Sequence, residues 1–138
     1  MADIQPAKDF SRAICDLFDI LADKATTSTQ RANIDRTRRL YSVYKQEEGT
    51  ESIVASLLPH LIAKKQAIFA KDATEMMSAE TRAKLIETKP KEVVISLYDF
   101  CVNCYKECTQ EEKDAVWAVI FAMYKACLEC AVAWKLSV

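Results

Sequence analysis

Gly49 is the only glycine among the 138 residues of this chain. An average composition of roughly 7% glycine would give about ten. Glycine supplies the tight turns, bulges and phosphate-binding loops of sheet proteins and nucleotide-binding folds, and the chain also has only three prolines. This scarcity argues against a β-sandwich or a nucleotide-binding α/β fold. It predicts an all-α domain with short connections.

The composition fits one well-packed domain. Hydrophobic residues make up 51% of the chain and charged residues 28%. A chain of this length can enclose a single core, so we expect residues 1–138 to form one helical domain. The 19 basic residues are balanced by 20 acidic ones, and this balance gives no overall electrostatic attraction to nucleic acid or to an anionic membrane.

The first half of the chain predicts three helices. The first covers about residues 6–24, and the polar stretch "TTSTQ" ends it. The second covers about residues 30–47 and stops at Gly49, a residue that commonly ends helices. The third starts near Glu51, and Pro59 is expected to kink or break it. The apolar face of the first helix consists of Phe10, Ile14, Leu17, Phe18 and Leu21.

The second half predicts three more helices, giving a compact bundle of about six. Ser78 caps a short helix, and Pro90 suits the first position of the next, which covers about residues 90–108. The sequence "TQEE" forms a capping box between Thr109 and Glu112, and the last helix runs from there to about residue 136. The last two helices therefore form an antiparallel hairpin with a very short turn, around which we expect the bundle to be built.

The last helix is apolar on nearly all sides. Between residues 115 and 136 its only charged side chains are Lys125, Glu129 and Lys135, and such a helix is buried on most of its faces. A membrane span needs about 18 or more uninterrupted apolar residues, whereas Lys125 interrupts this run after residue 124. We therefore expect a core helix and no membrane span. Burial of one face by a second chain is the other alternative.

Two C-x-x-C pairs, Cys101 with Cys104 and Cys127 with Cys130, have the spacing of a four-cysteine zinc site. Both pairs lie within predicted helices, and at 1.5 Å per residue they are roughly 20 Å apart along the predicted hairpin. Zinc–sulfur bonds of about 2.3 Å cannot join them. A redox pair is also disfavoured, because its first cysteine belongs at a helix N-terminus, where the thiol pKa is lowered.

The cysteines instead continue the apolar faces of the last two helices. We interpret them as small apolar core residues and expect no bound metal or cofactor, with metal binding or redox chemistry as the alternative. Free thiols indicate an intracellular, reducing compartment, either cytoplasmic, nuclear or virion-associated. The N-terminus, with Asp3 and no apolar run, indicates no secretory signal. The two faces are Val94, Leu97, Cys101, Cys104 and Cys108, and Val116, Ile120, Met123, Cys127, Cys130 and Trp134.

The stretch "QRANIDRTRRLYSVYK", residues 30–45, is the clearest charge cluster of the chain. It holds five basic residues against the single Asp35. Arginine and tyrosine are enriched at the energetic centres of protein interfaces, so we expect this helix face to contact a protein partner. Phosphate contacts to nucleic acid, or pairing with aspartates of the first helix, are the alternatives. The candidate residues are Arg31, Arg36, Arg38, Arg39, Tyr41, Tyr44 and Lys45.

No motif in the sequence points to catalysis. His60 is the only histidine, and no nucleophile or orienting carboxylate accompanies it in the sequence. Phosphate-binding loops and G-x-S-x-G elements are absent. We therefore expect no enzymatic activity. We expect a non-catalytic protein–protein interaction or assembly subunit of a larger complex, for example a virion or scaffold, that binds a protein partner or forms a homo-oligomer.

Overall fold

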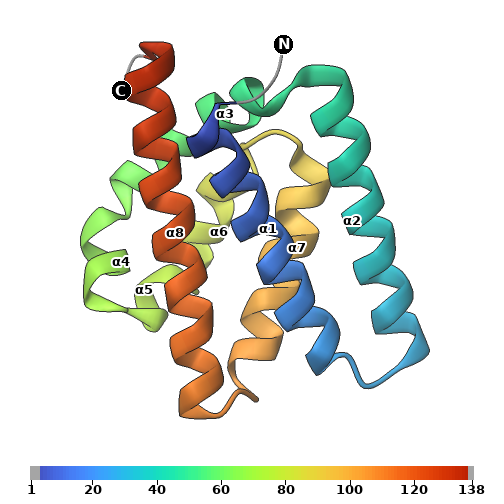
Figure 1. Cartoon of the computed structure of the whole chain (residues 1–138). Helices are drawn as coiled ribbons and strands as arrows, with labels where there is room; N and C mark the ends of the chain where they lie inside the picture. Colours follow the sequence, from blue (N-terminus) through green and yellow to red (C-terminus); the bar gives the residue numbers. More distant parts are fainter. Residues whose placement is uncertain (1–3, 137–138) are drawn as a thin grey trace.

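The computed structural model describes residues 4–136 and contains eight α-helices and no strand within that range (Figure 1). It confirms the predicted all-α bundle. Asp3, on which part of the N-terminal expectation rests, lies outside the described residues. The helices outnumber the predicted six because the chain between the third and seventh forms three short ones. The bounds are α1 Gln5–Lys24, α2 Ser28–Glu48, α3 Thr50–Ala63, α4 Lys65–Ala70, α5 Ala73–Met76, α6 Ala79–Leu85, α7 Lys91–Tyr105 and α8 Gln110–Trp134.

Two local signals set the ends of α2. Thr27 accepts a hydrogen bond from the Gln30 amide at 3.1 Å, and the Gln30 side chain accepts one from the Thr27 amide at 3.1 Å. This capping box starts α2 at Ser28, earlier than predicted. At the other end Gly49 has φ of 85°, a conformation that other residues adopt only with strain. Gly49 thereby joins α2 directly to α3.

Pro59 does not break the third helix. α3 continues past Pro59 to Ala63, and the helix ends at Lys64 instead. Pro59 has no amide hydrogen to donate to the carbonyl of Ala55, one turn earlier. Both residues are exposed, so water can bind that carbonyl. The helix therefore tolerates the proline on its outer face.

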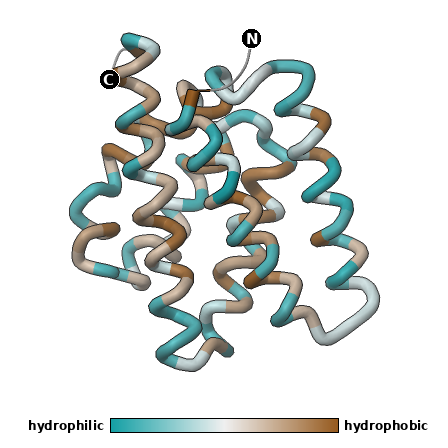
Figure 2. Tube along the Cα trace, in the orientation of Figure 1, coloured by the Kyte–Doolittle hydropathy of each residue, from teal (hydrophilic) through white to brown (hydrophobic). Residues whose placement is uncertain are grey.

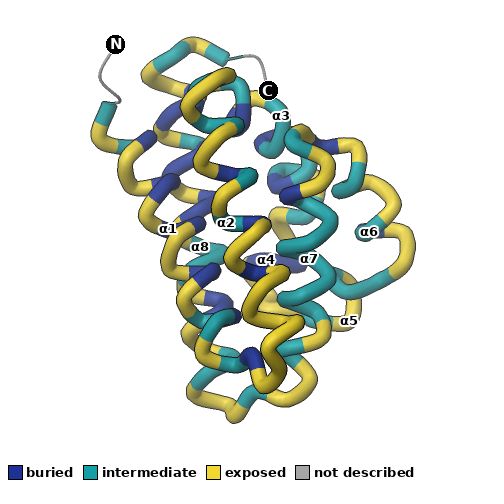
Figure 3. Tube along the Cα trace, turned by 90° about the vertical axis from the view of Figure 1, so that its right-hand side faces the viewer, coloured by how far each residue is buried: buried dark blue, intermediate teal, exposed yellow. Residues whose placement is uncertain are grey.

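The core lies between α1 and α8, which pack against each other more closely than any other two helices. All five apolar residues predicted for the first helix are buried. Cys127 and Cys130 of α8 have no exposed surface. Figure 2 shows hydrophobic and hydrophilic residues alternating along the long helices, and Figure 3 shows buried segments along α1 and α8. The amphipathic pattern of α1 therefore determines which of its side chains enter the core.

The outer face of α8 explains why its sequence reads as apolar all round. Ala115, Ala118 and Ala122 are exposed on that face, together with Lys125 and Glu129. Alanine is small and favours the helix without needing burial. The prediction of a buried last helix holds for its inner face, and alanines, together with Val132, which is 81% exposed, account for the apolar character of the outer one.

α8 is also the one described helix that is long and apolar enough to cross a membrane by length and composition. Half of its most apolar 18-residue window is buried inside the protein. The core helix of a soluble protein passes the same test, so this property of α8 is weak support for a membrane location.

The hairpin of α7 and α8 opens away from its turn. Near the turn, the indole nitrogen of Trp117 donates a hydrogen bond to the Tyr105 hydroxyl at 3.0 Å. Farther along, α8 packs on α1 and α3, whereas α7 packs on α2, α1 and α6. α7 ends at Tyr105, so Cys108, predicted within the helix, lies in the connection. Only Val93 of α7 is buried, and an apolar pocket lined by residues such as Cys101 of α7 and Ile120 of α8 lies between the two helices.

An ion pair ties the end of α1 to the start of α8 and predicts a pH dependence. Lys24 Nζ lies 2.6 Å from Glu112 Oε2, and this hydrogen bond, together with those in the capping box, lowers the pKa of Glu112 to about 2 from 4.5. Since the carboxylate form is favoured in the folded state, its contribution is complete above pH 4.5 and is lost as the pH falls towards 2.

We therefore expect the free energy of unfolding to decline between pH 5 and 2 less steeply in Glu112→Gln than in the unmodified protein. Glutamine keeps the capping box but cannot titrate. Urea unfolding at several pH values measures the difference between the two proteins. A difference that stays constant across this range would contradict the assignment of the lowered pKa to Glu112.

Candidate functional site

α2 lies at the edge of the bundle, which leaves most of its surface open (Figure 1). Of its residues, only Ile34, Thr37 and Tyr41 are buried. Figure 3 shows the exposed segments that run along its length. The structure thus places the predicted contact helix where a partner could reach it. The predicted residues divide into exposed Arg31, Arg36 and Arg39, half-buried Arg38, Tyr44 and Lys45, and buried Tyr41.

Tyr41 does not belong to the candidate contact surface. Its side chain is only 5% exposed, and its ring lies 6.2 Å from the ring of Phe18 on α1, tilted by 52°. Aromatic rings in this arrangement attract each other through edge and face contacts. The prediction of Tyr41 as a partner-binding residue is therefore wrong, because its ring fastens α2 to the core.

Arg38 also acts within the molecule. Its Nη2 lies 3.1 Å from Asp19 Oδ1, and its guanidinium carbon lies 5.5 Å from the centre of the Phe18 ring. One of the predicted alternatives was that the arginine cluster pairs with aspartates of the first helix. Arg38 forms such a pair with Asp19. The guanidinium of Arg38 joins α2 to α1, so it is already engaged within the molecule and has less capacity to bind a partner.

Arg36 and Arg39 remain as the accessible part of the cluster. Both are exposed, and neither has an ion-pair partner within the described part of the chain. Arg31 is exposed too, and its Nη2 makes one long hydrogen bond of 3.4 Å to the carbonyl of Ala25. The structure therefore retains three of the four arginines of the cluster as candidates for contact with another molecule.

A groove of about 390 Å³ lies between α2 and the start of α7. We call it the α2–α7 groove. Val43, which is 52% exposed, lines it together with the half-buried Tyr44. Arg36 lies on the same side of α2 as Val43, seven residues or about two turns away. The groove is lined by Leu40, Val43, Tyr44 and Glu47 from α2 and by Lys89, Pro90, Lys91, Glu92 and Val93.

The second wall of the α2–α7 groove was not predicted from the sequence. Lys89 and Pro90 precede α7 and are more than forty residues from Val43. Their position depends on the packing of α7 against α2. The local pattern carries no signal for this approach, since a half-apolar α7 could have packed on any neighbouring helix.

Cys127 and Cys130 are fully buried, whereas Cys101 and Cys104 of the first pair are half-buried. Burial raises the pKa of the Cys101 thiol to about 12 and that of Cys127 to about 12, so both stay protonated at neutral pH. Thiolates, not thiols, bind metals and attack disulfides. Within residues 4–136, no group of three or more His, Cys, Asp or Glu side chains is placed to hold a metal ion. This environment supports the interpretation of Cys127 and Cys130 as core residues.

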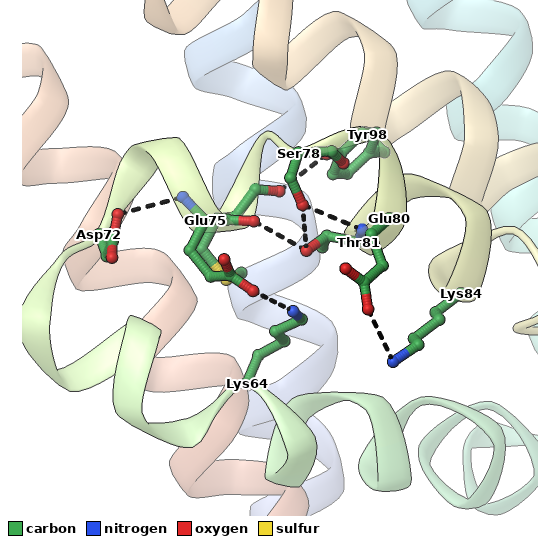
Figure 4. Close-up of polar contacts among 9 residues, drawn as sticks. Lys64, Asp72, Glu75, Ser78, Glu80, Thr81, Lys84 and Tyr98 are labelled. Atoms are coloured by element: carbon green, nitrogen blue, oxygen red, sulfur yellow. Dashed lines mark hydrogen bonds and ion pairs between the residues drawn. The ribbon is translucent and has the colours of Figure 1, made fainter.

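A cluster of polar side chains around α5 and α6 has a structural role (Figure 4). Lys64 Nζ lies 2.5 Å from Glu75 Oε1. The Thr81 hydroxyl donates to the carbonyl of Glu75 at 2.7 Å, and the Tyr98 hydroxyl donates to the carbonyl of Met76 at 2.7 Å. These groups satisfy each other and the backbone of two short helices. They hold α5 and α6 against α7.

His60 is half-buried in α3, near the end of that helix. The polar cluster of Figure 4 does not include His60 among its labelled residues.

Comparisons of this chain with known protein families, with curated proteins and with solved structures find no match.

Proposed function

We propose that this protein is a non-catalytic interaction or assembly subunit that binds another protein through Arg36, Arg39 and the α2–α7 groove. The observation that supports the proposal is that Arg36 and Arg39, exposed and without an ion-pair partner among the described residues, lie one to two helical turns from Val43 in a groove lined by both apolar and charged side chains. Protein interfaces combine an apolar centre with arginine and tyrosine at the positions that contribute most to binding.

The chemistry of this surface defines the partner. Val43 and Tyr44 offer apolar surface to aliphatic or aromatic side chains. Arg36 and Arg39 each offer a planar guanidinium that binds a carboxylate with two parallel hydrogen bonds. A protein segment with apolar residues flanked by aspartate or glutamate would match both features. We infer a partner of this kind, and a second copy of the chain would be one instance of it.

Contact with nucleic acid through the same arginines is the alternative function, favoured by the lack of acidic partners for Arg36 and Arg39 between residues 4 and 136. The small number of phosphate contacts available argues against binding to nucleic acid. With Arg31 included, about three phosphates would be neutralised, giving a salt dependence with a slope of roughly −3. A protein that contacts six to ten phosphates has a slope of roughly −5 to −9, so about three contacts would supply only part of that electrostatic attraction. Protein contact is therefore the function that this surface supports better.

The test uses the double charge reversal Arg36→Glu/Arg39→Glu. In tandem purification from the source cells followed by native mass spectrometry, we expect the unmodified protein to carry a stoichiometric protein companion, or a second copy. The double variant should bind that companion at least about thirtyfold more weakly, corresponding to roughly 2 kcal/mol. The affinity is then measured with both purified proteins by isothermal titration calorimetry.

Lys8→Glu/Arg12→Glu provides the matched control, because both residues are exposed on α1 and the same number of charges is reversed. It should keep the companion and its affinity. A companion retained equally by both double variants would refute the assignment to the α2–α7 groove. A protein that is monomeric and without a companion, but binds nucleic acid with a steep salt dependence, would refute the proposal in favour of its alternative.

A further inference from the structure

An apolar cavity of about 150 Å³ lies inside the bundle and is lined mainly by residues of α1, α3, α7 and α8. We call it the inner cavity. It adjoins the pocket of about 90 Å³ between α7 and α8, and the two share Cys101 and Ile120 among their lining residues. Natural cores have few voids larger than a water molecule, because atoms at the edge of a void lose dispersion contacts. Adjoining spaces of this size are therefore unfavourable when they are empty.

The position of α7 explains the inner cavity. α7 packs on α1, α2 and α6, whereas the backbones of α3 and α8 do not approach it to the same extent. The inner, apolar face of α7 includes Val94, Leu97 and Cys101, which all line the inner cavity and are only half-buried. The face of α7 that a helical bundle would normally bury against a neighbouring helix therefore borders a space.

The thiol of Cys101 indicates that this space is dry. Cys101 keeps accessible surface and is only half-buried, yet burial raises the pKa of its thiol to about 12. A cysteine side chain in bulk water keeps a pKa of about 8.5. The accessible surface of Cys101 therefore faces an interior space, from which bulk water is excluded, and not the solvent around the protein.

The walls of the inner cavity expose no polar surface to it. Residues with a polar group, such as Tyr41 and Tyr98, therefore line it with the apolar parts of their side chains. Water is a poor occupant, because a buried water needs two to four polar partners. A charged or hydrogen-bonding ligand would lose its hydration without gaining a replacement partner. The walls thus select a neutral ligand that has no hydrogen-bonding group.

The volume and the side chains of the walls define the ligand further. In another protein, an engineered cavity of about 150 Å³ lined by aliphatic and aromatic residues stays dry and binds benzene, so the inner cavity has room for one such ring. Met76, Met123 and Phe10 are among its lining residues. Methionine sulfur makes favourable contacts with aromatic rings, and aromatic side chains attract a further ring through edge and face contacts. These side chains favour an aromatic ring over an aliphatic ligand of the same size.

We propose that the inner cavity binds a small neutral aromatic hydrocarbon, a single ring with at most a short alkyl substituent that extends into the pocket between α7 and α8. The ring contacts Leu97 and Cys101 of α7 and Met123 of α8. Its binding supplies the dispersion contacts that the empty space lacks and needs no hydrogen bond. This ligand is independent of the protein partner proposed above, because these three residues do not line the α2–α7 groove.

The test is calorimetric titration of the full chain with benzene, together with thermal unfolding followed by circular dichroism. At a benzene concentration tenfold above its Kd, we expect the unfolding midpoint to rise by about 5 °C. Phenol adds one hydroxyl to the same ring, and it should bind roughly tenfold more weakly, because that hydroxyl finds no partner in the inner cavity. Absence of benzene binding, or equal affinities for benzene and phenol, would overturn the proposal.

Two variants that fill the inner cavity test the site itself. Cys101→Leu and Leu97→Phe enlarge side chains that line the inner cavity but not the α2–α7 groove. Each should abolish the rise of the unfolding midpoint with benzene, because the larger side chain occupies the space of the ring. Cys15→Leu is the matched control, since it makes the same change at an exposed position of α1, and it should keep the full rise.

Crystals of the unmodified protein under xenon pressure give a measurement that does not depend on how the variants fold. Xenon is a neutral apolar probe that enters dry cavities, and we expect it beside Cys101 and Met123. A benzene effect that persists in both filling variants, or xenon bound only outside the bundle, would place the ligand elsewhere and overturn the proposal.

Discussion

Replacing Phe18 by alanine is expected to lower the free energy of unfolding by about 3–5 kcal/mol, which is typical of a large buried aromatic residue. Phe18 has no exposed surface. It lies where α1 meets α2, with the Tyr41 ring 6.2 Å away and the Arg38 guanidinium 5.5 Å from its own ring. The substitution removes buried apolar surface, an aromatic contact and a cation–π contact at once. Urea unfolding followed by circular dichroism measures the loss.

Phe69→Ala is the matched control, because the same atoms are removed from a side chain that is 54% exposed. Phe69 has edge contacts with Phe121 and Tyr124, whose ring centres lie 5.1 and 5.9 Å away. Losing these should reduce the free energy of unfolding by roughly 1 kcal/mol. Similar losses in both variants would mean that Phe18 is not a central contact of the core.

The features predicted correctly from the sequence depend on short-range physics. The capping box of Thr109 and Glu112 forms as expected, with hydrogen bonds of 2.9 and 3.2 Å, because both partners lie within one turn. Gly49 ends α2 because its backbone conformation is available at low energy to glycine alone. The buried face of α1 follows from helical spacing, which needs no knowledge of the neighbouring helices.

The burial of Tyr41 and the unbroken helix at Pro59 share a cause. Each depends on how its helix is rotated about its own axis, which decides the residues that face the core. Tyr41 and Tyr44 are three residues apart and so lie on nearly the same side of α2, yet the first is buried and the second lines the α2–α7 groove. Pro59 was expected to kink or break α3, and the helix continues past it, because its exposed position lets water bind the freed carbonyl. Periodicity places residues on a common face without fixing how that face meets its neighbours.

The α2–α7 groove and the apolar pocket between α7 and α8 depend on packing between distant segments. Pro90 and Tyr44 line one groove only because α7 packs on α2, and the pocket brings Cys101 of α7 together with Ile120 of α8. The crossing angle of two helices depends on side-chain ridges across the whole interface. A sequence with a short turn between two helices predicts that they are antiparallel, but it does not predict how far they separate.

The second large effect concerns Cys127, whose substitution by serine is expected to lower the free energy of unfolding by about 1–3 kcal/mol. The side chain has no exposed surface, and serine would place a hydroxyl among the apolar residues between α1 and α8. Cys15→Ser is the matched control, because Cys15 is exposed on α1, and its effect should stay within about 0.5 kcal/mol. Denaturant unfolding under reducing conditions measures both.

The same pair of variants separates a structural role for the cysteines from a chemical one. Since burial raises the pKa of Cys127 to about 12, its thiol should resist alkylation by iodoacetamide in the folded protein, while Cys15 reacts. If Cys127 is a core residue, Cys127→Ser should lose stability without any change in bound metal. If Cys127→Ser left stability unchanged but removed stoichiometric zinc, as measured by native mass spectrometry, the C-x-x-C pairs would be ligands and the packing of α8 against α1 would have to differ from the one described here.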